Sequence, residues 1–311
     1  MAPRHNRPTL TFKASPIRVR VPATSANLGS AFDCAGLALS LYDDLVAQIT
    51  DDEGISVDIH GEGADELPRN HRHLVAKSML AAFDAMGGRP RGFALVCANH
   101  IPHGRGLGSS SAAIVGGIVL ARALVVGGDQ LLPDAEALAL ASEIEGHPDN
   151  VAATLLGGFT IAWTEGAGKA VTLPAHKEIV PVVCIPHTAL ATKKARGLLP
   201  ESVSHADASF NVSRSALLVA AMTKFPALLM EATDDKLHQQ QRREAMPRSL
   251  DLVAKLREAG FPAAVSGAGP TVIAFASKST AHLVAGLVGA KFDVLELAVD
   301  PEGASVVPLD A

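Results

Sequence analysis

The sequence has few of the residues on which several classes of protein depend. Its 311 residues include one Trp, one Tyr and three Cys, and only 19% are charged. Grooves that bind sugars or single-stranded nucleic acid use aromatic side chains as stacking platforms, so this scarcity argues against such grooves. Cys34, Cys97 and Cys184 are too few and too scattered for a disulfide framework or a thiolate metal site. We therefore expect three reduced, buried cysteines.

Charge and the length of apolar runs exclude further classes. The net charge is −5, and no basic excess of the kind that binds polyanions is present, so we expect no nucleic-acid or membrane partner. The longest apolar run, Ala112 to Val126, contains Arg122 and falls short of the roughly 20 residues that span a bilayer. It predicts a buried helix. Residues 1–15 lack the apolar core of a secretion signal, so we expect a cytoplasmic protein.

The remaining composition is that of a globular protein with a large core. Hydrophobic residues make up 48% of the chain, and 27 residues are glycine. Strand-type and helix-type segments alternate irregularly, without the βαβ rhythm of a parallel sheet, which predicts the α+β class. The length suggests two domains, and the glycine-rich segment 165–168 is the best linker. We expect a flexible tail at residues 1–16, an N-terminal domain at 17–167 and a C-terminal domain at 168–311.

Local patterns predict individual elements. Strands are expected at residues 17–21, 37–49, 55–59, 92–99, 159–163, 180–185 and 271–276, from alternating or short apolar runs. Helices are expected at 74–86, from 109 to about 126, 133–145, 213–225, 248–259 and 280–287. Ser109 is the expected N-cap of the second helix.

A glycine loop between a strand and this long apolar helix is the most informative segment. Successive backbone N–H groups and the positive end of a helix dipole make such a loop a site for phosphate. The P-loop lysine is absent, and so is dinucleotide-fold spacing. We expect a phosphate-binding site at Pro102, His103, Gly104, Arg105, Gly106, Leu107, Gly108, Ser109, Ser110, Ser111 and Ala112.

The loop resembles the phosphate-binding motif of the GHMP kinases, and three further motifs stand in that family's order. They are Val21 to Asp33, with Ser-Ala-Asn-Leu-Gly before Phe-Asp; Glu145 to Val151, with His-Pro-Asp-Asn; and Val265 to Thr271. The residues of the first two of these motifs are similar to those of the homoserine kinases in particular. The resemblance implies a ribosomal-protein-S5-like N-terminal domain and a ferredoxin-like C-terminal domain, with ATP, held through its phosphates by the glycine loop, and Mg²⁺ as cofactors. Kinases of this family are often dimers, so a homodimer is one expectation, and the oligomeric state stays open.

The resemblance also implies roles for single residues. Ser110 matches the family's Mg²⁺ ligand, and Glu143 is the preferred carboxylate beside it, with Glu145 as the alternative. The substrate-binding residues are Asn27, Asp33 and His147 for the amino and hydroxyl ends, Arg196 and Arg242 for the carboxylate, and Thr192 and Gly267 nearby. Because Arg243 is adjacent to Arg242, the choice between these two arginines stays open. Asn150 is expected to orient the substrate hydroxyl, and Asp149 to be its neighbouring carboxylate. We count both as catalytic, and whether any side chain acts as a base stays open.

The activity that the resemblance implies is ATP-dependent phosphorylation of L-homoserine to O-phospho-L-homoserine, a step toward threonine. Two alternatives remain at this point. One is a related small-molecule kinase that acts on mevalonate or another isoprenoid precursor. The other is a non-catalytic ATP-binding sensor on the same scaffold. Inhibition by threonine is also left open. No motif marks the adenine pocket, and residues 70–75 are chosen for it by position alone.

Overall fold

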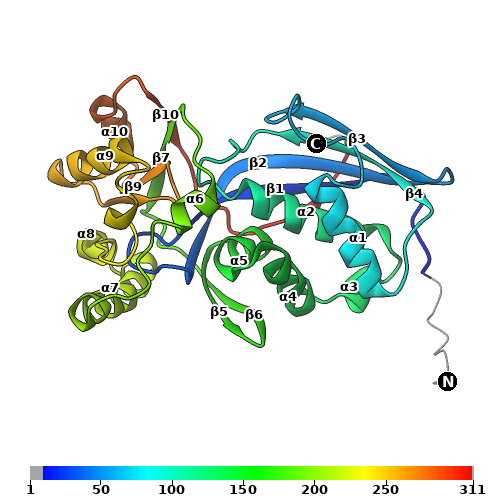
Figure 1. Cartoon of the computed structure of the whole chain (residues 1–311), viewed down its shortest axis with the longest axis horizontal. Helices are drawn as coiled ribbons and strands as arrows, with labels where there is room; N and C mark the ends of the chain where they lie inside the picture. Colours follow the sequence, from blue (N-terminus) through cyan, green and yellow to red (C-terminus); the bar gives the residue numbers. More distant parts are fainter. Residues whose placement is uncertain (1–9, 310–311) are drawn as a thin grey trace.

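The structure, a computed structural model, describes residues 10–309 and contains two domains, each built on one sheet (Figure 1). The larger sheet runs in the order β11-β1-β2-β4-β3, and β5 and β6 extend it from β2. Strands β3 and β4 pair in parallel, and the other pairs are antiparallel. The strands are β1 (Ile17–Ala26), β2 (Ala35–Thr50), β3 (Gly54–Gly61), β4 (Gly92–Asn99), β5 (Phe159–Glu165), β6 (Ala167–Leu173) and β11 (Ser305–Val307).

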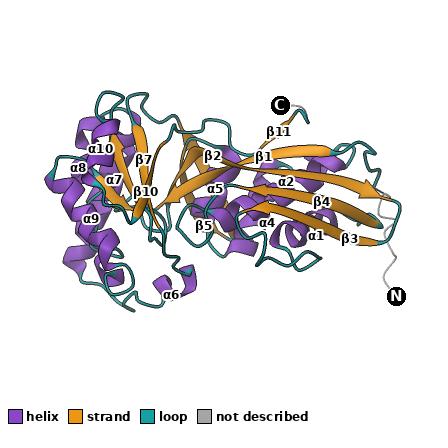
Figure 2. Cartoon of the chain, turned by 90° about the horizontal axis from the view of Figure 1, so that it is seen from above, coloured by secondary structure: helices purple, strands orange, loops and turns teal. Residues whose placement is uncertain are grey.

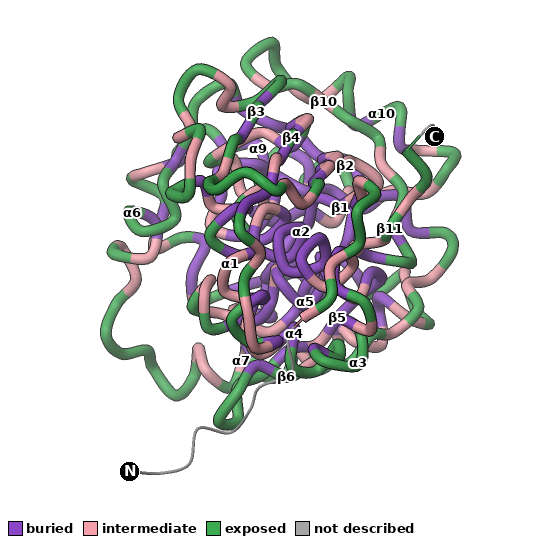
Figure 3. The backbone as a smooth tube through the Cα atoms, turned by 90° about the vertical axis from the view of Figure 1, so that its right-hand side faces the viewer, coloured by how far each residue is buried: buried purple, intermediate pink, exposed green. Residues whose placement is uncertain are grey.

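Helices cover one face of this sheet (Figure 2). They are α1 (Leu74–Met86), α2 (Ser109–Leu124), the short α3 (Gly128–Leu131), α4 (Asp134–Glu145) and α5 (Pro148–Leu156). Buried backbone gathers around α2 and α5 (Figure 3). Helix α2 is apolar on nearly all sides because it lies between the sheet and α1, where a Cβ on Gly117 would lie 2.5 Å from the Val75 carbonyl oxygen. The predicted buried helix is therefore confirmed.

The second domain has a four-stranded antiparallel sheet in the order β10-β7-β9-β8. Taken in chain order this is 4-1-3-2, the arrangement of a ferredoxin-like sheet. Its strands are β7 (Val180–Pro186), β8 (Ala263–Val265), β9 (Val272–Ala276) and β10 (Phe292–Glu296). The helical elements are α6 (Thr192–Arg196), α7 (His205–Thr223), η1 (Pro226–Leu228), α8 (Leu229–Ala232), η2 (Gln240–Arg242), α9 (Pro247–Glu258) and α10 (Ala281–Leu287). The two mainly antiparallel sheets agree with the predicted α+β class.

The predicted division at residue 167 falls inside the β5–β6 hairpin. Gly166 forms its turn with φ 73°, and strand pairing continues in the first sheet to Leu173. The glycine-rich segment is thus a turn, and the first domain extends beyond it. The chain later returns: Ala298 exchanges hydrogen bonds with Ser40, the Gly158 N–H donates to the Asp300 carbonyl, and β11 pairs with β1.

Two further local predictions differ from the structure. Helix α2 begins at Ser109 itself, and Gly108 takes the N-cap position with φ 72°, so the predicted Ser109 N-cap is wrong. The expected tail lies partly outside the described residues, which begin at residue 10. Within them, Thr11 and Lys13 hydrogen-bond to the backbone at the end of α2, and Phe12 packs edge-on against Phe83, so this part is held in place. Among residues 10–309, no helix combines the length and apolar character needed to cross a membrane.

Candidate active site

Three loops from distant parts of the sequence interlock between the two domains. The glycine loop joins β4 to α2, the loop after β1 carries Asn27, and the loop between β8 and β9 carries Ser266 and Gly267. The Ser266 hydroxyl donates to the Gly106 carbonyl at 2.6 Å, and the Asn27 amide donates to the Gly267 carbonyl at 2.8 Å. Asn27 adopts φ 70°, a conformation that asparagine tolerates better than most residues. These bonds fix the walls of one cleft.

Glycine is required in the phosphate loop for two reasons. Gly104, Gly106 and Gly108 have φ of 62°, 79° and 72°, in the left-handed region. A Cβ on Gly106 would lie 2.4 Å from the Ser266 carbonyl oxygen, and one on Gly108 only 2.0 Å from Thr24 Oγ1. The loop therefore delivers the backbone to the start of α2, whose first N–H groups have no partner within the helix. This is the geometry of an anion site.

Not every residue of the predicted loop faces the cleft. The glycines, Ser109 and Ser110 line it, whereas Leu107 and Ala112 are buried in the core of the first domain. The Arg105 guanidinium donates to the carbonyls of His103, Pro186 and His187, at 2.9 to 3.1 Å. Arg105 therefore connects the loop to the end of β7 in the second domain.

A carboxylate lies beside the loop, but it is not the preferred one. The hydroxyls of Ser110 and Ser111 donate to Glu145 Oε1 at 2.6 and 3.1 Å. Glu143 is exposed and faces a separate cavity between α4 and the β5–β6 hairpin. Two residues apart on a helix means a rotation of about 200°, so the two side chains point in nearly opposite directions. The preference for Glu143 is wrong because its side chain points away from the loop, and the alternative, Glu145, is the carboxylate that contacts the loop.

The corner between α4 and α5 brings the His-Pro-Asp-Asn motif into the cleft. His147 Nδ1 lies 2.6 Å from Asp149 Oδ1, which also accepts the Asn150 backbone N–H at 2.8 Å. Burial lowers the pKa of His147, but the hydrogen bond and charge of Asp149 outweigh it and raise the pKa overall. The amide oxygen of Asn150 accepts from the Thr24 hydroxyl at 2.9 Å. Asn150 is thereby oriented by the first motif.

The opposite wall carries the two predicted arginines. Arg196 makes a bidentate ion pair with Asp33, with N–O distances of 2.9 and 2.7 Å, and both side chains are about one-third exposed. Arg242 is 1% exposed and hydrogen-bonds to His238 and to two carbonyls. Burial lowers the pKa of Arg242 to about 10, and the charge of Arg196 contributes. Arg243 is exposed and bonded to Gln240 and Asp251, so Arg242 is the arginine of the cleft.

These residues line a single cleft with a volume of about 160 Å³. Six of the seven predicted substrate residues line this cleft. The seventh, Asp33, does not line it but is bonded to Arg196, which does. Ala268 completes the wall. The residues brought together are Asn27, Gly104, Gly106, Gly108, Ser109, Ser110, Glu145, His147, Asp149, Asn150, Thr192, Arg196, Arg242, Gly267 and Ala268.

A second cavity, which no motif marks, opens beside the same serines. This pocket of about 180 Å³ is mainly apolar, and its lining includes Leu74, Val75, Ala113, His73 and Asp43, together with Ser109 and Ser110. His73 is 3% exposed, and within the described chain neither of its ring nitrogens has a hydrogen-bond partner. Burial lowers its pKa, with a contribution from His103, so the ring is neutral. The only signal in the sequence was position, which pointed to residues 70–75.

Known proteins are similar to this chain in sequence. Models of the GHMP kinase N-terminal and C-terminal domains match residues 73–158 and 214–293. A homoserine kinase of Streptomyces avermitilis is 57% identical over 301 residues, which cover 96% of this chain and 98% of the relative. One of Streptomyces coelicolor is 56% identical over 299 residues, 96% of each chain.

A solved structure gives the same result for the fold. The homoserine kinase of Cytophaga hutchinsonii has a TM-score of 0.83 and 26% identity, and the match covers 96% of this chain and all of that one. The predicted two-domain fold is confirmed. From its motifs, its fold and these relatives, the chain belongs to the GHMP kinase family and, within it, to the homoserine kinases.

Proposed function

We propose that the protein transfers the γ-phosphoryl group of ATP to the hydroxyl of L-homoserine, giving O-phospho-L-homoserine and ADP. The hydroxyl oxygen bonds to the γ-phosphorus as the bond from phosphorus to the bridging oxygen breaks, and the hydroxyl proton is released. The relatives named above support this substrate. We further propose that the product is used to make threonine, that the enzyme is cytoplasmic and that it is a homodimer, which fractionation and light scattering test.

ATP would occupy both cavities. Its phosphates suit the N–H groups of the glycine loop and the start of α2, where the dipole favours negative charge. The base suits the apolar pocket that adjoins Ser109 and Ser110. His73 is one of the polar side chains against this pocket, and both of its ring nitrogens are buried.

Ser110 and Glu145 are the residues that would hold Mg²⁺. A hydroxyl and a carboxylate 2.6 Å apart are oxygen donors of the kind this cation prefers. No group of three or more His, Cys, Asp or Glu side chains that could hold a metal exists among residues 10–309, so the protein would supply only part of the ligand shell. When bound, the ion neutralises charge on the phosphates.

The substrate is a zwitterion, and the cleft offers charges for both of its ends. Its carboxylate fits Arg242, a buried cation, and the fork of Arg196. Its ammonium fits Asp33. Asp33 and Arg196 form an ion pair with each other when no substrate is bound. Substrate binding would replace it with two ion pairs, one between Asp33 and the ammonium and one between Arg196 and the carboxylate. A ligand that carries both charges therefore leaves neither side chain unpaired.

The hydroxyl of the substrate would then lie near Asn150. Thr24 fixes the amide oxygen of Asn150, and one amide hydrogen is directed to Asp149 Oδ1 at 3.3 Å, which leaves the second amide hydrogen to orient the hydroxyl oxygen. Asp149 is occupied by His147 and by the Asn150 backbone, which fits a supporting carboxylate better than a base. The loose transition state of phosphoryl transfer does not require a strong base.

The observation that carries this proposal is that one cleft joins a phosphate loop, a Ser110–Glu145 pair and two arginines positioned for a carboxylate. The test is release of ADP from Mg-ATP, with L-homoserine and mevalonate compared as acceptors. We expect turnover with L-homoserine alone. Turnover with mevalonate alone would contradict the substrate, and ATP binding without transfer to either acceptor would contradict the activity.

A further inference from the structure

The buried guanidinium of Arg242 differs from that of Arg196 in its partners. Arg196 is neutralised by the carboxylate of Asp33, whereas Arg242 forms no ion pair with any carboxylate of residues 10–309. Its acceptors are the carbonyl oxygens of Ala195 at 3.2 Å and Gly267 at 3.5 Å, and the ring of His238 at 3.1 Å. His238 is thus the one side chain, within the described part of the chain, that hydrogen-bonds to this guanidinium.

The surroundings of His238 determine where its proton lies. The ring is fully buried, and Nε2 lies 2.7 Å from the Gly29 carbonyl oxygen. A carbonyl can only accept, so Nε2 carries the hydrogen and Nδ1 presents a lone pair to Arg242. Burial lowers the pKa of His238, and Arg242 lowers it further against the opposing effect of Asp235, so the ring is neutral. A neutral acceptor holds the arginine without cancelling its charge.

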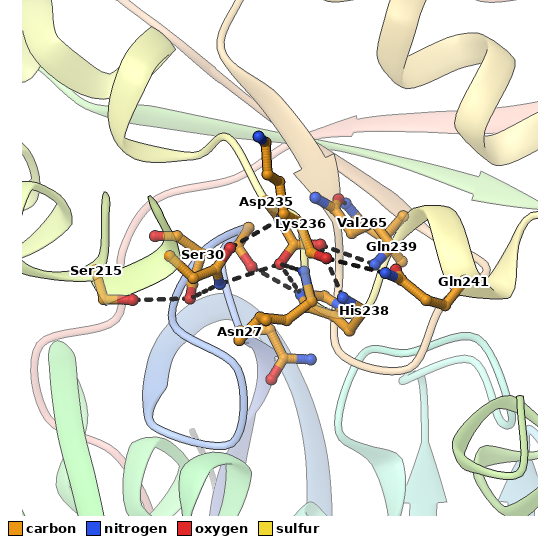
Figure 4. A network of polar contacts seen from close by, with 12 residues as sticks. Asn27, Ser30, Ser215, Asp235, Lys236, His238, Gln239, Gln241 and Val265 are labelled. Atoms are coloured by element: carbon orange, nitrogen blue, oxygen red, sulfur yellow. Dashed lines mark hydrogen bonds and ion pairs between the residues drawn. The ribbon is translucent and has the colours of Figure 1, made fainter. Parts of the chain in front are cut away.

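A buried network sets the position of this ring (Figure 4). The carboxylate of Asp235 accepts the backbone N–H groups of residues 237, 238 and 239 at 2.8 to 3.1 Å, which fixes the turn that carries His238. Asn211 bonds to Asp235 at 3.2 Å and to the Ser30 carbonyl at 2.7 Å. Ser215 donates to the same carbonyl at 2.8 Å. The turn is therefore attached to the loop that carries the first motif.

Phe32 connects the same ring to both arginines. It stacks on His238 with a centroid distance of 5.1 Å and an angle of 28°. The guanidinium carbons of Arg242 and Arg196 lie 5.5 and 5.7 Å from its centroid. A shift of the His238 ring would therefore disturb Arg242 directly and Arg196 through Phe32.

We propose that His238 is a positioning residue for the substrate carboxylate. Its neutral Nδ1 holds Arg242 in the wall of the cleft with its charge available, and its Nε2–H anchors the ring to Gly29. The inference rests on the proposed function, because it assigns the charge of Arg242 to the carboxylate of an amino-acid substrate.

Two conservative variants separate the two nitrogens. His238→Gln keeps a donor near the Nε2 position and loses the acceptor for Arg242, whereas His238→Asn keeps an acceptor near the Nδ1 position. We expect His238→Gln to raise the KM for L-homoserine on the order of 10- to 100-fold, the effect of losing one hydrogen bond to a charged group. His238→Asn should stay within about 3-fold of the parent, since it keeps that bond. The KM for ATP should change in neither.

A probe without a carboxylate tests the role itself. The inhibition constant of 3-aminopropan-1-ol, which has the hydroxyl and the ammonium alone, should be the same in both variants and the parent. Ser213→Ala, on the same helix α7 but with its hydroxyl bonded to the Phe210 carbonyl outside this network, is the control and should leave every constant unchanged. Equal behaviour of the Gln and Asn variants, or a parallel rise for 3-aminopropan-1-ol, overturns the inference. A parent chain that does not phosphorylate L-homoserine overturns the proposed function instead.

Discussion

Replacing Arg242 with methionine separates a functional charge from a structural one. Burial lowers the pKa of Arg242 from 12.5 to about 10, which corresponds to about 3 kcal/mol of destabilisation of its charged form. Because the folded pKa lies below the unfolded one, this cost is present in full at neutral pH. The variant removes the cost but loses good hydrogen bonds from a charged donor to Ala195 and His238, worth about 1.5 kcal/mol each. We expect the two effects nearly to cancel.

The expected change in the free energy of unfolding of Arg242→Met is therefore within about 2 kcal/mol of zero, whereas breaking a buried ion pair costs about 3–5 kcal/mol. The kcat/KM for L-homoserine should fall at least about 100-fold, because a carboxylate loses a charged, hydrogen-bonded partner. Urea unfolding and the ADP-release assay measure the two quantities.

Arg257→Met is the matched control. Arg257 donates to the carbonyl of Met230 and the hydroxyl of Thr233, at 2.8 and 2.9 Å, and more weakly to the Ala263 carbonyl at 3.3 Å, with Asp234 at 3.9 Å; it does not line the cleft. Its replacement should cost at least about 3 kcal/mol of stability, about 1.5 kcal/mol for each of the two shorter bonds from a charged donor, and leave kcat/KM unchanged. If Arg242→Met instead loses more than about 3 kcal/mol of stability while keeping its activity, the arginine is structural and our reasoning is refuted.

Three further predictions concern the same cleft. Gly108→Ala should lower kcat and stability together, because its Cβ would meet Thr24 Oγ1 at 2.0 Å at a positive φ; unchanged steady-state kinetics would contradict this. Glu145→Gln should raise the Mg²⁺ concentration needed for half-maximal rate, whereas Glu143→Gln should not; equal metal titrations would remove Glu145 from the metal site. The raised pKa of His147 stabilises the fold below about pH 6.5 and less as pH rises through the folded value, so His147→Gln should lose more stability at pH 6 than at pH 9 in urea unfolding.

The sequence predicts best the features that depend on local patterns. Strand β4 occupies the predicted residues 92–99, and α1 the predicted residues 74–86, because glycine marks one boundary of each: Gly92 begins the apolar run of β4, and Gly87 ends the helical stripe of α1. The glycine loop is as distinctive, since each of its three glycines adopts a positive φ. The order of the motifs was enough to predict that distant loops meet in one site.

Other features depend on how elements are oriented against each other. Glu143 and Glu145 are equivalent in the sequence, and only the packing of α4 against α2 turns Glu145 toward Ser110. The segment 165–168 has the composition of a linker and of a hairpin turn alike, and pairing of β6 with β5 decides between them. His238 carries no local signal at all, because its role comes from contacts with Gly29 and Arg242.

The return of the chain to the first sheet makes the second domain an insertion within the first. Two connections cross between the domains, one after Leu173 and one after Glu296, and the second ends in β11. A protease cut between residues 174 and 179 would therefore leave both fragments attached, because β1 of the larger N-terminal fragment pairs with β11 of the C-terminal one. The nicked protein should migrate as one species on a native gel and as two on a denaturing gel, and neither domain can be isolated by a single truncation.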